Sequence, residues 1–362
     1  MLTRMWSERP GERRTSFRRE GGQIMSGIMR SAARFGLVAC LVMAYQVAEA
    51  GELVKVKLTL DWILYGKHAG FYAAAEKGFY RENGLDVTIL RGFGSGDTVK
   101  RIAAGSEEFG FADTTPVLIA RSRGEKIKEI GIIHDRSLYT IIALKGSGIT
   151  KPKDLEGRSI GSPEGNAVKV VFPAFAAANR IDDAKVKWIT MTAEAVVPSL
   201  IAGRIDAGGF FATEIPTVRA AAQQVRKEID IQYYSDYGVD VYSNGLIATD
   251  KIIKEKPDLV KRFVHATMKG FAWAVENPEE ATDIFVRHNP AISRELARAH
   301  WEIAVDHLLT PTALKMGIGY MTREKMEYTR DTITNYMKLP VKVPVEDIYT
   351  NEFLPKLFPK RK

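Results

Sequence analysis

Alternating apolar and polar positions mark the first strand of the chain. Four apolar residues occupy every second position there: Val54, Val56, Leu58 and Leu60. Such alternation is typical of a strand with one buried face. It stops at Asp61-Trp62, where a carboxylate and an indole lie together at the strand's end. A helix over residues 70–80 and a strand over residues 85–90 follow, separated by the turn Asn83-Gly84.

The same succession of strand, acidic end and helix recurs along the chain. Three further strand ends carry a carboxylate near aromatic or hydroxyl residues, at Asp113, Glu164 and Glu214. A second series of strands and helices begins near residue 153, and residues 257–337 are predicted to be mainly amphipathic helices. This alternation predicts an α/β fold whose ligand crevice lies beyond the carboxyl ends of the strands. We therefore expect these strand ends to converge on one cleft.

The residues near these strand ends form the candidate ligand site. Carboxylates beside planar rings suit a flat, nitrogen-rich or cationic small molecule, through stacking and hydrogen bonds. A glycine-rich loop over residues 91–97 precedes a predicted helix, so it could hold an anion or a polar ligand edge, or form only a tight turn. The expected ligand contacts are Asp61, Trp62, Tyr65, His68, Ser95, Asp113, Thr114, Glu164, Phe211 and Glu214.

Several of these residues also have a purely structural alternative. Trp62 and Phe211 could be core aromatics, whereas Asp61 and Asp113 could cap helices or lie in solvated turns. His68 could be a cap or lie behind the residues that contact the ligand. The sequence contains no HExxH motif, no GxSxG elbow and no Walker lysine. We therefore expect a binding protein with no catalytic residues, no metal ligands and no cofactor.

The first fifty residues have the composition of a secretory signal. Arg30 and Arg34 precede an apolar run over residues 35–45, and Ala48-Glu49-Ala50 offers a small-x-small cleavage site. The run is too short for a permanent membrane span, and the alternative is a buried N-terminal helix. Met25 or Met29 could be the true start. Cys40 is the only cysteine, and it lies in a weak lipoprotein cleavage box. Cleavage after Ala50 would remove it, so the mature chain could form no disulfide and would have no thiol chemistry.

Length and charge narrow the class of protein further. The 362 residues suffice for two domains of ordinary size. Of the net charge of +8, the first fifty residues contribute +4, from eight arginines and four glutamates. The remaining positive charge is small and dispersed, so no nucleic-acid partner is predicted.

Several motifs, read in order, resemble the NMT1/THI5-like family. They are Leu60-Asp-Trp, His68-Ala-Gly-Phe-Tyr, Lys77-Gly-Phe-Tyr, Asn83-Gly-Leu-Asp-Val, Gly94-Ser-Gly-Asp, Phe109-Gly-Phe-Ala-Asp, Asp154-Leu-Glu-Gly and Gly203-Arg-Ile-Asp-Ala. The resemblance covers residues 53–338. It implies a monomeric periplasmic substrate-binding protein of an ABC importer, with the type II periplasmic binding protein fold and a permease partner in the inner membrane. Residues 53–141 and 246–338 would form lobe 1, residues 142–245 lobe 2, and residues 339–362 a basic tail.

Within this family, the chain is similar to proteins that bind thiamine's pyrimidine precursors. The resemblance implies that Asp61, Trp62 and Glu214 contact the pyrimidine. Two stretches depart from that pattern, Ile63-Leu64-Tyr65-Gly66 and Phe211-Ala212-Thr213. The second loses hydrogen-bond donors and an indole, so the ligand could be larger, more apolar or not a pyrimidine.

Two other functions within the same fold stay open at this point. One is a thiamine pyrimidine synthase, although the fungal synthases of the family use a cysteine-rich iron motif that the mature chain would lack. The other is a sulfonate or anion binder. It predicts basic pocket residues, for which Arg91, Arg136 and Lys169 are the candidates.

Overall fold

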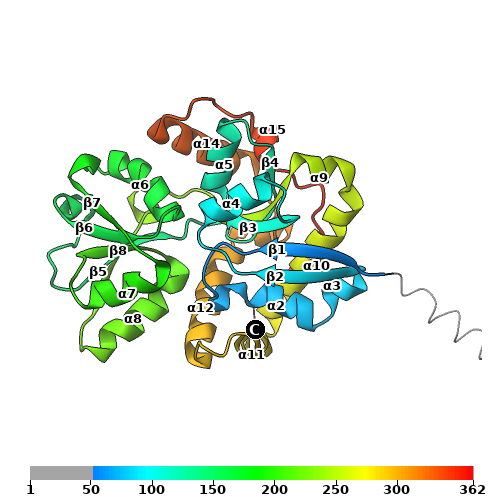
Figure 1. The fold of residues 1–362 in the computed structure, drawn as a ribbon, viewed down its shortest axis with the longest axis horizontal. Helices are drawn as coiled ribbons and strands as arrows, with labels where there is room; N and C mark the ends of the chain where they lie inside the picture. Colours follow the sequence, from blue (N-terminus) through cyan, green and yellow to red (C-terminus); the bar gives the residue numbers. More distant parts are fainter. Residues whose placement is uncertain (1–51, 362) are drawn as a thin grey trace, which may run out of the picture. The chain divides into compact units, whose positions relative to one another are not determined.

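Two five-stranded sheets form the framework of the protein (Figure 1). The computed structural model describes residues 52–361, so the predicted signal segment with Cys40 lies outside the described residues. The first sheet has the order β2-β1-β3-β10-β4. Its strands are β1 (Val54–Thr59), β2 (Leu85–Leu90), β3 (Phe109–Asp113), β4 (Ile127–Ile132) and β10 (Asn244–Thr249).

The second sheet repeats this arrangement, with the order β7-β6-β8-β5-β9. Its strands are β5 (Tyr139–Leu144), β6 (Ser159–Ser162), β7 (Lys187–Thr190), β8 (Ala207–Phe211) and β9 (Ile229–Tyr233). In each sheet four strands run in the same direction, and the fourth in the order, β10 or β5, is antiparallel to the neighbours on both its sides. The chain therefore passes between the sheets twice, from β4 to β5 and from β9 to β10. The predicted α/β architecture is confirmed.

The predicted lobe boundaries fall inside two of these strands. A division at residue 142 would cut β5, although all of β5 pairs within the second sheet. A division at residue 246 would likewise cut β10, which pairs with β3 and β4 of the first sheet. Both sheets lie in the same compact unit, Leu53–Lys362.

The helix predicted over residues 70–80 is divided in two. It forms α2 (Ala69–Glu76) and α3 (Phe79–Glu82), because Gly78 between them has a φ of 79°, which ends a right-handed helix. The helix α2 packs closely on α10 (Pro257–Glu276). The backbones approach so tightly that a Cβ at Gly270 would lie 2.5 Å from the Gly70 carbonyl oxygen. This packing fixes the start of α2 and the loop before it.

The remaining helices complete the layers around the two sheets. They are α4 (Ser95–Ala103), α5 (Thr114–Ser122), α6 (Ala167–Ala178), α7 (Ala193–Ile201), α8 (Ile215–Gln224), α9 (Asp250–Glu255), α11 (Pro278–His288), α12 (Arg294–Leu308), α13 (Pro311–Met316), α14 (Arg323–Met337) and α15 (Val345–Ile348). Two 3₁₀ turns matter for the site, η1 (Gly66–His68) and η4 (Ala212–Glu214). Within residues 52–361, no helix combines the length and the apolar character needed to cross a membrane.

The C-terminal segment packs on both sheets. Met326 and Ile333 of α14 are buried in the hydrophobic cluster of the second sheet, and α14 contacts α6. Beyond it, Val345 and Ile348 of α15 are buried as well, and Tyr349 forms a bridge with Glu129 of β4. Part of the predicted basic tail is therefore folded against the sheets.

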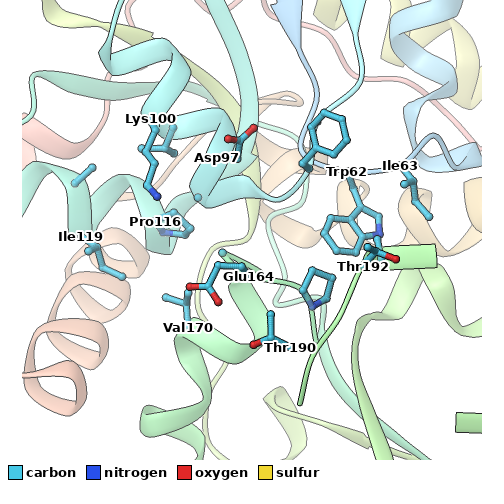
Figure 2. Close-up of a pocket in the computed structure, with 18 of the residues that line it drawn as sticks. Trp62, Ile63, Asp97, Lys100, Pro116, Ile119, Glu164, Val170, Thr190 and Thr192 are labelled. Carbon is cyan, nitrogen blue, oxygen red and sulfur yellow. The ribbon is translucent and has the colours of Figure 1, made fainter. Parts of the chain in front are cut away.

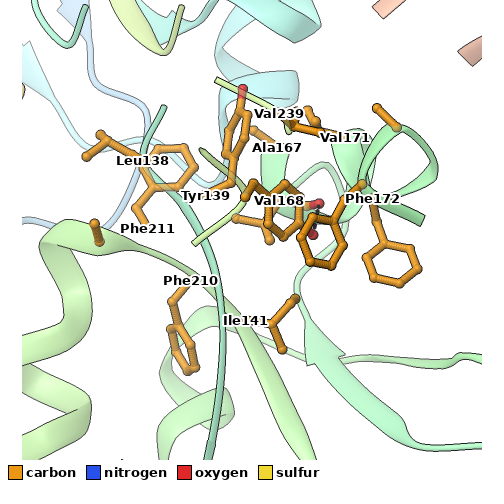
Figure 3. Packing of buried hydrophobic residues seen from close by; sticks show 14 of the residues in the cluster. Leu138, Tyr139, Ile141, Ala167, Val168, Val171, Phe172, Phe210, Phe211 and Val239 are labelled. Carbon is orange, nitrogen blue, oxygen red and sulfur yellow. Dashed lines mark hydrogen bonds between the residues drawn. The ribbon is translucent and has the colours of Figure 1, made fainter. Parts of the chain in front are cut away.

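A hydrophobic cluster behind β5 and β8 positions one wall of the site. Figure 3 shows Tyr139 of β5 and Phe211 of β8 beside Val168 and Phe172 of α6. The Tyr139 and Phe211 ring centroids are 5.7 Å apart. Because Phe211 is the last residue of its strand, this packing also fixes the point where η4 begins.

Candidate functional site

Asp61 lies at the centre of a buried group formed by Asp61, Lys67, His68 and Asn244. We call this group the cavity floor, because Asp61 lines the small cavity described below. The Lys67 Nζ donates to Asp61 Oδ2 at 2.6 Å, and the Asn244 Nδ2 donates to the same oxygen at 3.0 Å. The His68 Nε2 is 2.9 Å from Asp61 Oδ1. All four residues are buried. Three donors from two distant parts of the chain thus converge on one carboxylate.

The floor is an ion pair with a neutral histidine beside it. Burial alone would raise the pKa of Asp61, but Lys67 and His68 together hold it well below its ordinary value. Burial lowers the pKa of His68, against the effect of Asp61. The Tyr65 backbone N–H donates to His68 Nδ1 at 3.2 Å, so Nε2 carries the ring proton and donates it to Asp61. The 3₁₀ turn η1 places Lys67 and His68 for these roles.

A hydrogen bond between Trp62 and Glu214 joins the two sheets. Trp62 follows β1, and its Nε1 donates to Glu214 Oε1 at 3.0 Å. Glu214 ends the turn η4 after β8, where its Oε2 accepts the Phe211 backbone N–H at 2.8 Å. Burial raises the pKa of Glu214 to about 7, although Phe211, Lys67 and Trp62 act in the opposite direction. This carboxyl therefore changes charge near neutral pH.

A small cavity of about 10 Å³ lies between these groups. Its walls come from both sheets and from the glycine-rich loop: Asp61, Trp62, Gly94, Ser95, Asn166, Ala167, Phe211 and Glu214. A volume of roughly 10–15 Å³ accommodates one water molecule. A heteroaromatic ring therefore enters only if Trp62 moves or the two sheets separate.

A much larger groove, of about 1240 Å³, adjoins this cavity (Figure 2). We call it the outer groove. One side is formed by Trp62 and Ile63 together with residues from segments 91–100 and 116–125. The other side is formed by residues from segments 163–170 and 190–194, and Met337 of α14 completes it. Trp62 lines both the small cavity and the outer groove, so the two spaces share a wall.

The ten predicted contacts occupy four different places. Five of them line the small cavity: Asp61, Trp62, Ser95, Phe211 and Glu214. Glu164 instead lines the outer groove, where its side chain is 85% exposed and its carboxylate lies 3.7 Å from the Lys169 Nζ. The strand ends therefore converge only in part.

Tyr65 and His68 lie behind the cavity. The Tyr65 ring is 4.8 Å from that of His300, whose Nε2 is 2.7 Å from the Thr217 hydroxyl of α8. Burial lowers the pKa of His300 to about 3, so this contact between α12 and α8 involves a neutral ring. Tyr65 and His68 are therefore not part of the cavity lining, and His68 reaches the cavity only through its hydrogen bond with Asp61.

Asp113 and Thr114 belong to a second buried group, at the crossing between the sheets. We define the hinge cluster as Asp113, Thr114, Thr115, Tyr139 and Ser243. The Tyr139 and Ser243 hydroxyl groups donate hydrogen bonds to Asp113. The Thr115 backbone N–H also donates to it, at 2.9 Å, which makes Asp113 the N-cap of α5. The Thr114 hydroxyl donates to the Ser243 carbonyl oxygen at 2.8 Å. Within residues 52–361, the lining of the small cavity and that of the outer groove include neither Asp113 nor Thr114.

Three residues of the site are absent from the predicted set. Lys67 adjoins His68 in the sequence, and a lysine in an apolar neighbourhood was the available signal. Asn166 caps α6 by accepting the Val168 N–H at 2.7 Å, and it follows Glu164 by two residues. Asn244 lies 183 residues from Asp61, so nothing local in the sequence indicates their contact. In the part of the chain that the structure describes, no group of three or more potential ligands could hold a metal ion.

The NMT1/THI5-like family description matches residues 66–281, more than half of the chain. The chain belongs to this family. The predicted resemblance is thereby confirmed.

Three relatives of this family member show the range of names among similar proteins. It is 28% identical to a formylaminopyrimidine-binding protein of Halalkalibacterium halodurans, over 69% of this chain and 74% of the relative. It is 26% identical to a riboflavin-binding protein of Chloroflexus aurantiacus, over 84% of this chain and 87% of the relative. It is also 25% identical to a 4-amino-5-hydroxymethyl-2-methylpyrimidine phosphate synthase of Legionella pneumophila, over 83% and 92%.

Solved structures confirm the periplasmic binding protein fold. An alkanesulfonate-binding protein of Xanthomonas axonopodis pv. citri matches with a TM-score of 0.62 at 12% identity, over 83% of this chain and 99% of that one. A periplasmic aliphatic sulphonate binding protein of Escherichia coli matches with a TM-score of 0.61 at 11% identity, over 85% and 93%. At such identities the likeness shows the fold alone.

Proposed function

We propose that this chain is the solute-binding component of an ABC importer, which holds a small heteroaromatic solute between its two sheets and delivers it to a permease in the inner membrane. The observation that carries this proposal is the cavity shared by both sheets, where Trp62 and Phe211 lie beside Asp61 and Glu214. Aromatic faces with few, fixed polar groups are typical of small-molecule sites.

The two carboxyl groups would have different roles. Asp61 has its oxygens engaged by Lys67, His68 and Asn244, so it holds the floor in place. Glu214 accepts from Trp62 and from one backbone N–H. A ring N–H of the ligand would replace the Trp62 indole as donor to Glu214. With a pKa of about 7, Glu214 could also be protonated and donate to a ring nitrogen.

The names of the relatives support a heteroaromatic solute of the pyrimidine type. One relative is named for a formylaminopyrimidine and another for riboflavin, which both contain a pyrimidine ring. The fold shared with periplasmic proteins supports a periplasmic location, and we propose that the protein acts there as a monomer. An anionic solute fits less well, because Glu214 would repel it and the nearby Lys67 cation is already paired with Asp61.

A synthase is the second candidate, because two of the relatives carry that name. Lys67 and His68 are the amine and the imidazole of the cavity floor, and both are residue types that serve in catalysis. Both are buried and donate to Asp61, so their nitrogen atoms are occupied in the floor. This arrangement favours a structural role for both side chains and a binding function for the protein.

Calorimetric titration of the mature protein with aminopyrimidines, flavins and sulfonates would test the proposal. We expect a heteroaromatic compound to bind, and to be recovered unchanged after incubation. Glu214→Ala should weaken binding by about 1–3 kcal/mol, because the ligand's ring N–H is left buried and unpaired. Trp62→Ala should weaken it by about 0.5–1.5 kcal/mol, because an aromatic stacking contact is lost. Trp273→Ala is the matched control, since Trp273 packs beside Lys77 outside both cavities. Unchanged affinity in both site variants would refute the site, and chemical conversion of the ligand would favour the synthase.

A further inference from the structure

The two spaces at the site differ in size by two orders of magnitude. The small cavity of about 10 Å³ contains the hydrogen-bonding groups, whereas the outer groove beside it has about 1240 Å³. Pockets for drug-sized ligands are roughly 300–1,000 Å³. A single pyrimidine ring bound between Trp62 and Glu214 would leave most of the outer groove to solvent. The shared Trp62 wall makes the groove a continuation of the same site.

The outer groove offers an exposed aromatic ring. Phe93, in the glycine-rich loop, lines the groove and is 59% exposed. It belongs to none of the hydrophobic clusters found among residues 52–361, so its ring is not part of the packed core. The Arg91 guanidinium lies 4.8 Å from the Phe93 ring centroid and pairs with Glu194 of the other wall. Phe93 is thus held beside the cleft with a ring surface accessible for stacking.

The opposite wall is adaptable and uncharged in its middle. Met191 lies between Thr190 and Thr192 there, and all three line the groove. A thioether side chain fits irregular or flat ligands well, and hydroxyl groups accept and donate hydrogen bonds. Together with Phe93, this wall suits a planar body that carries neutral polar groups.

The charges around the groove nearly cancel. Its lining contains three cations, Arg91, Lys100 and Arg123, and four carboxylates, Asp97, Glu125, Glu164 and Glu194. Two of these charges, Arg91 and Glu194, already neutralise each other. A groove of this composition has no excess of positive charge to select a phosphate or sulfonate. It therefore favours an extension without net charge.

We propose that the outer groove holds the larger part of the ligand, a fused-ring heteroaromatic body with an uncharged polar chain, while a pyrimidine-type edge of the same molecule reaches Trp62 and Glu214. This inference rests on the proposed function, because it names the class of solute that the same site takes. Phe93 stacks on the fused rings, and Met191 contacts them from the other wall. Ring size and the neutral chain, rather than the pyrimidine edge alone, then set specificity.

Three probes and three proteins test the inference by calorimetry. The probes are riboflavin, its 5′-phosphate, and the single-ring 4-amino-5-hydroxymethyl-2-methylpyrimidine. The proteins are the unaltered chain, Phe93→Ala and the matched control Phe358→Ala, which replaces a 50% exposed phenylalanine that does not line the groove. Thermal unfolding checks that each variant folds.

We expect riboflavin to bind more tightly than the single-ring compound and at least as tightly as its phosphate. Phe93→Ala should lower the affinity for riboflavin about 3- to 10-fold, the usual range for one lost aromatic contact. It should change the affinity for the single-ring compound by less than about twofold. Phe358→Ala should change neither affinity.

The contrary results separate this inference from the proposed function. Tight binding of the single-ring compound with no effect of Phe93→Ala on any probe would overturn the inference and leave the proposed function standing. Tighter binding of riboflavin 5′-phosphate than of riboflavin would refute the inference that the ligand's polar chain is uncharged. If no heteroaromatic probe binds, both the inference and the proposed function are wrong.

Discussion

The cavity floor and the hinge cluster are each built around one buried aspartate at the end of a strand of the first sheet. Asp61 follows β1 and Asp113 ends β3, and both are almost completely buried. Asp61 is paired with the Lys67 ammonium, whereas Asp113 meets only hydroxyl groups and one backbone N–H. The same residue type in the same kind of position thus has two environments.

The partners decide the charge of each aspartate. Burial raises the pKa of Asp113 to about 6 because its hydrogen bonds offset only part of the lost hydration. For Asp61 the nearby cation reverses the direction of the pKa shift. Asn244 and Ser243, neighbours on the chain entering β10, connect the two groups, since Asn244 donates to Asp61 and Ser243 to Asp113. A buried strand-end aspartate in this protein is therefore a fixed charge only where a cation accompanies it.

Removal of the Lys67 charge should have the largest effect. Lys67→Met keeps the length of the side chain but leaves the Asp61 carboxylate buried without its cation. Breaking a buried pair in this way costs about 3–5 kcal/mol. We expect a loss of that order in the free energy of unfolding, measured with urea at pH 7.5. Adding Asp61→Asn to the same chain should restore part of it, since the unpaired charge is removed.

Lys100→Met is the matched control for this prediction. Lys100 is exposed at the outer groove, so the same substitution there should change the free energy of unfolding by less than about 0.5 kcal/mol. Equal losses in both variants would show that the Lys67–Asp61 pair contributes nothing specific.

Asp113→Asn should change the pH dependence of stability. The folded-state pKa of Asp113, about 6, lies above the ordinary value of 3.8, so the folded state binds more protons between these values. The contribution of Asp113 to stability therefore falls as the pH rises from about 4 to 6. Relative to the unaltered chain, the variant should gain up to about 3 kcal/mol across that interval. Urea unfolding from pH 4 to 7.5 measures the difference, and a constant difference would contradict the assignment.

The sequence could predict much of the framework because apolar periodicity reports burial directly. The strand predicted at residues 54–60 is β1, and residues 257–337, predicted to be mainly amphipathic helices, form α10 to α14. Asp61, Trp62, Phe211 and Glu214 also lie together around one cavity. The resemblance carried by contiguous motifs and the strand-end pattern were sufficient for this grouping.

The rest depends on contacts that no local pattern contains. The division of the first helix follows from the backbone conformation of Gly78, and the strand-end pattern alone cannot distinguish Asp61 from Asp113. Their difference arises from where Lys67, Tyr139 and Ser243 lie after the chain crosses between the sheets. Glu164 is a strand-end acid like Glu214, yet it remains exposed because the turn before α6 points it into the outer groove.

Tyr139→Phe should have a smaller, pH-dependent effect. The Tyr139 hydroxyl donates to Asp113, and a hydrogen bond to a charged group contributes about 1.5–3 kcal/mol. We expect a loss of roughly 2 kcal/mol in the free energy of unfolding at pH 7.5, where Asp113 is ionised, and a smaller loss at pH 4.5, where it is protonated. Tyr234→Phe is the control, because the Tyr234 hydroxyl donates to a neutral carbonyl at 3.2 Å. An equal loss at both pH values would contradict the prediction for Tyr139.

Glu164→Ala should have the smallest effect on stability, because this strand-end acid has neither the burial nor the close partners of the two aspartates. Its side chain is 85% exposed, and Lys169 lies 3.7 Å away. Exposed pairs of this kind contribute about 0–1 kcal/mol, and we expect less than about 0.5 kcal/mol by urea unfolding at pH 7.5. A loss comparable to that of Lys67→Met would mean that charge at the groove, rather than burial, governs these strand ends.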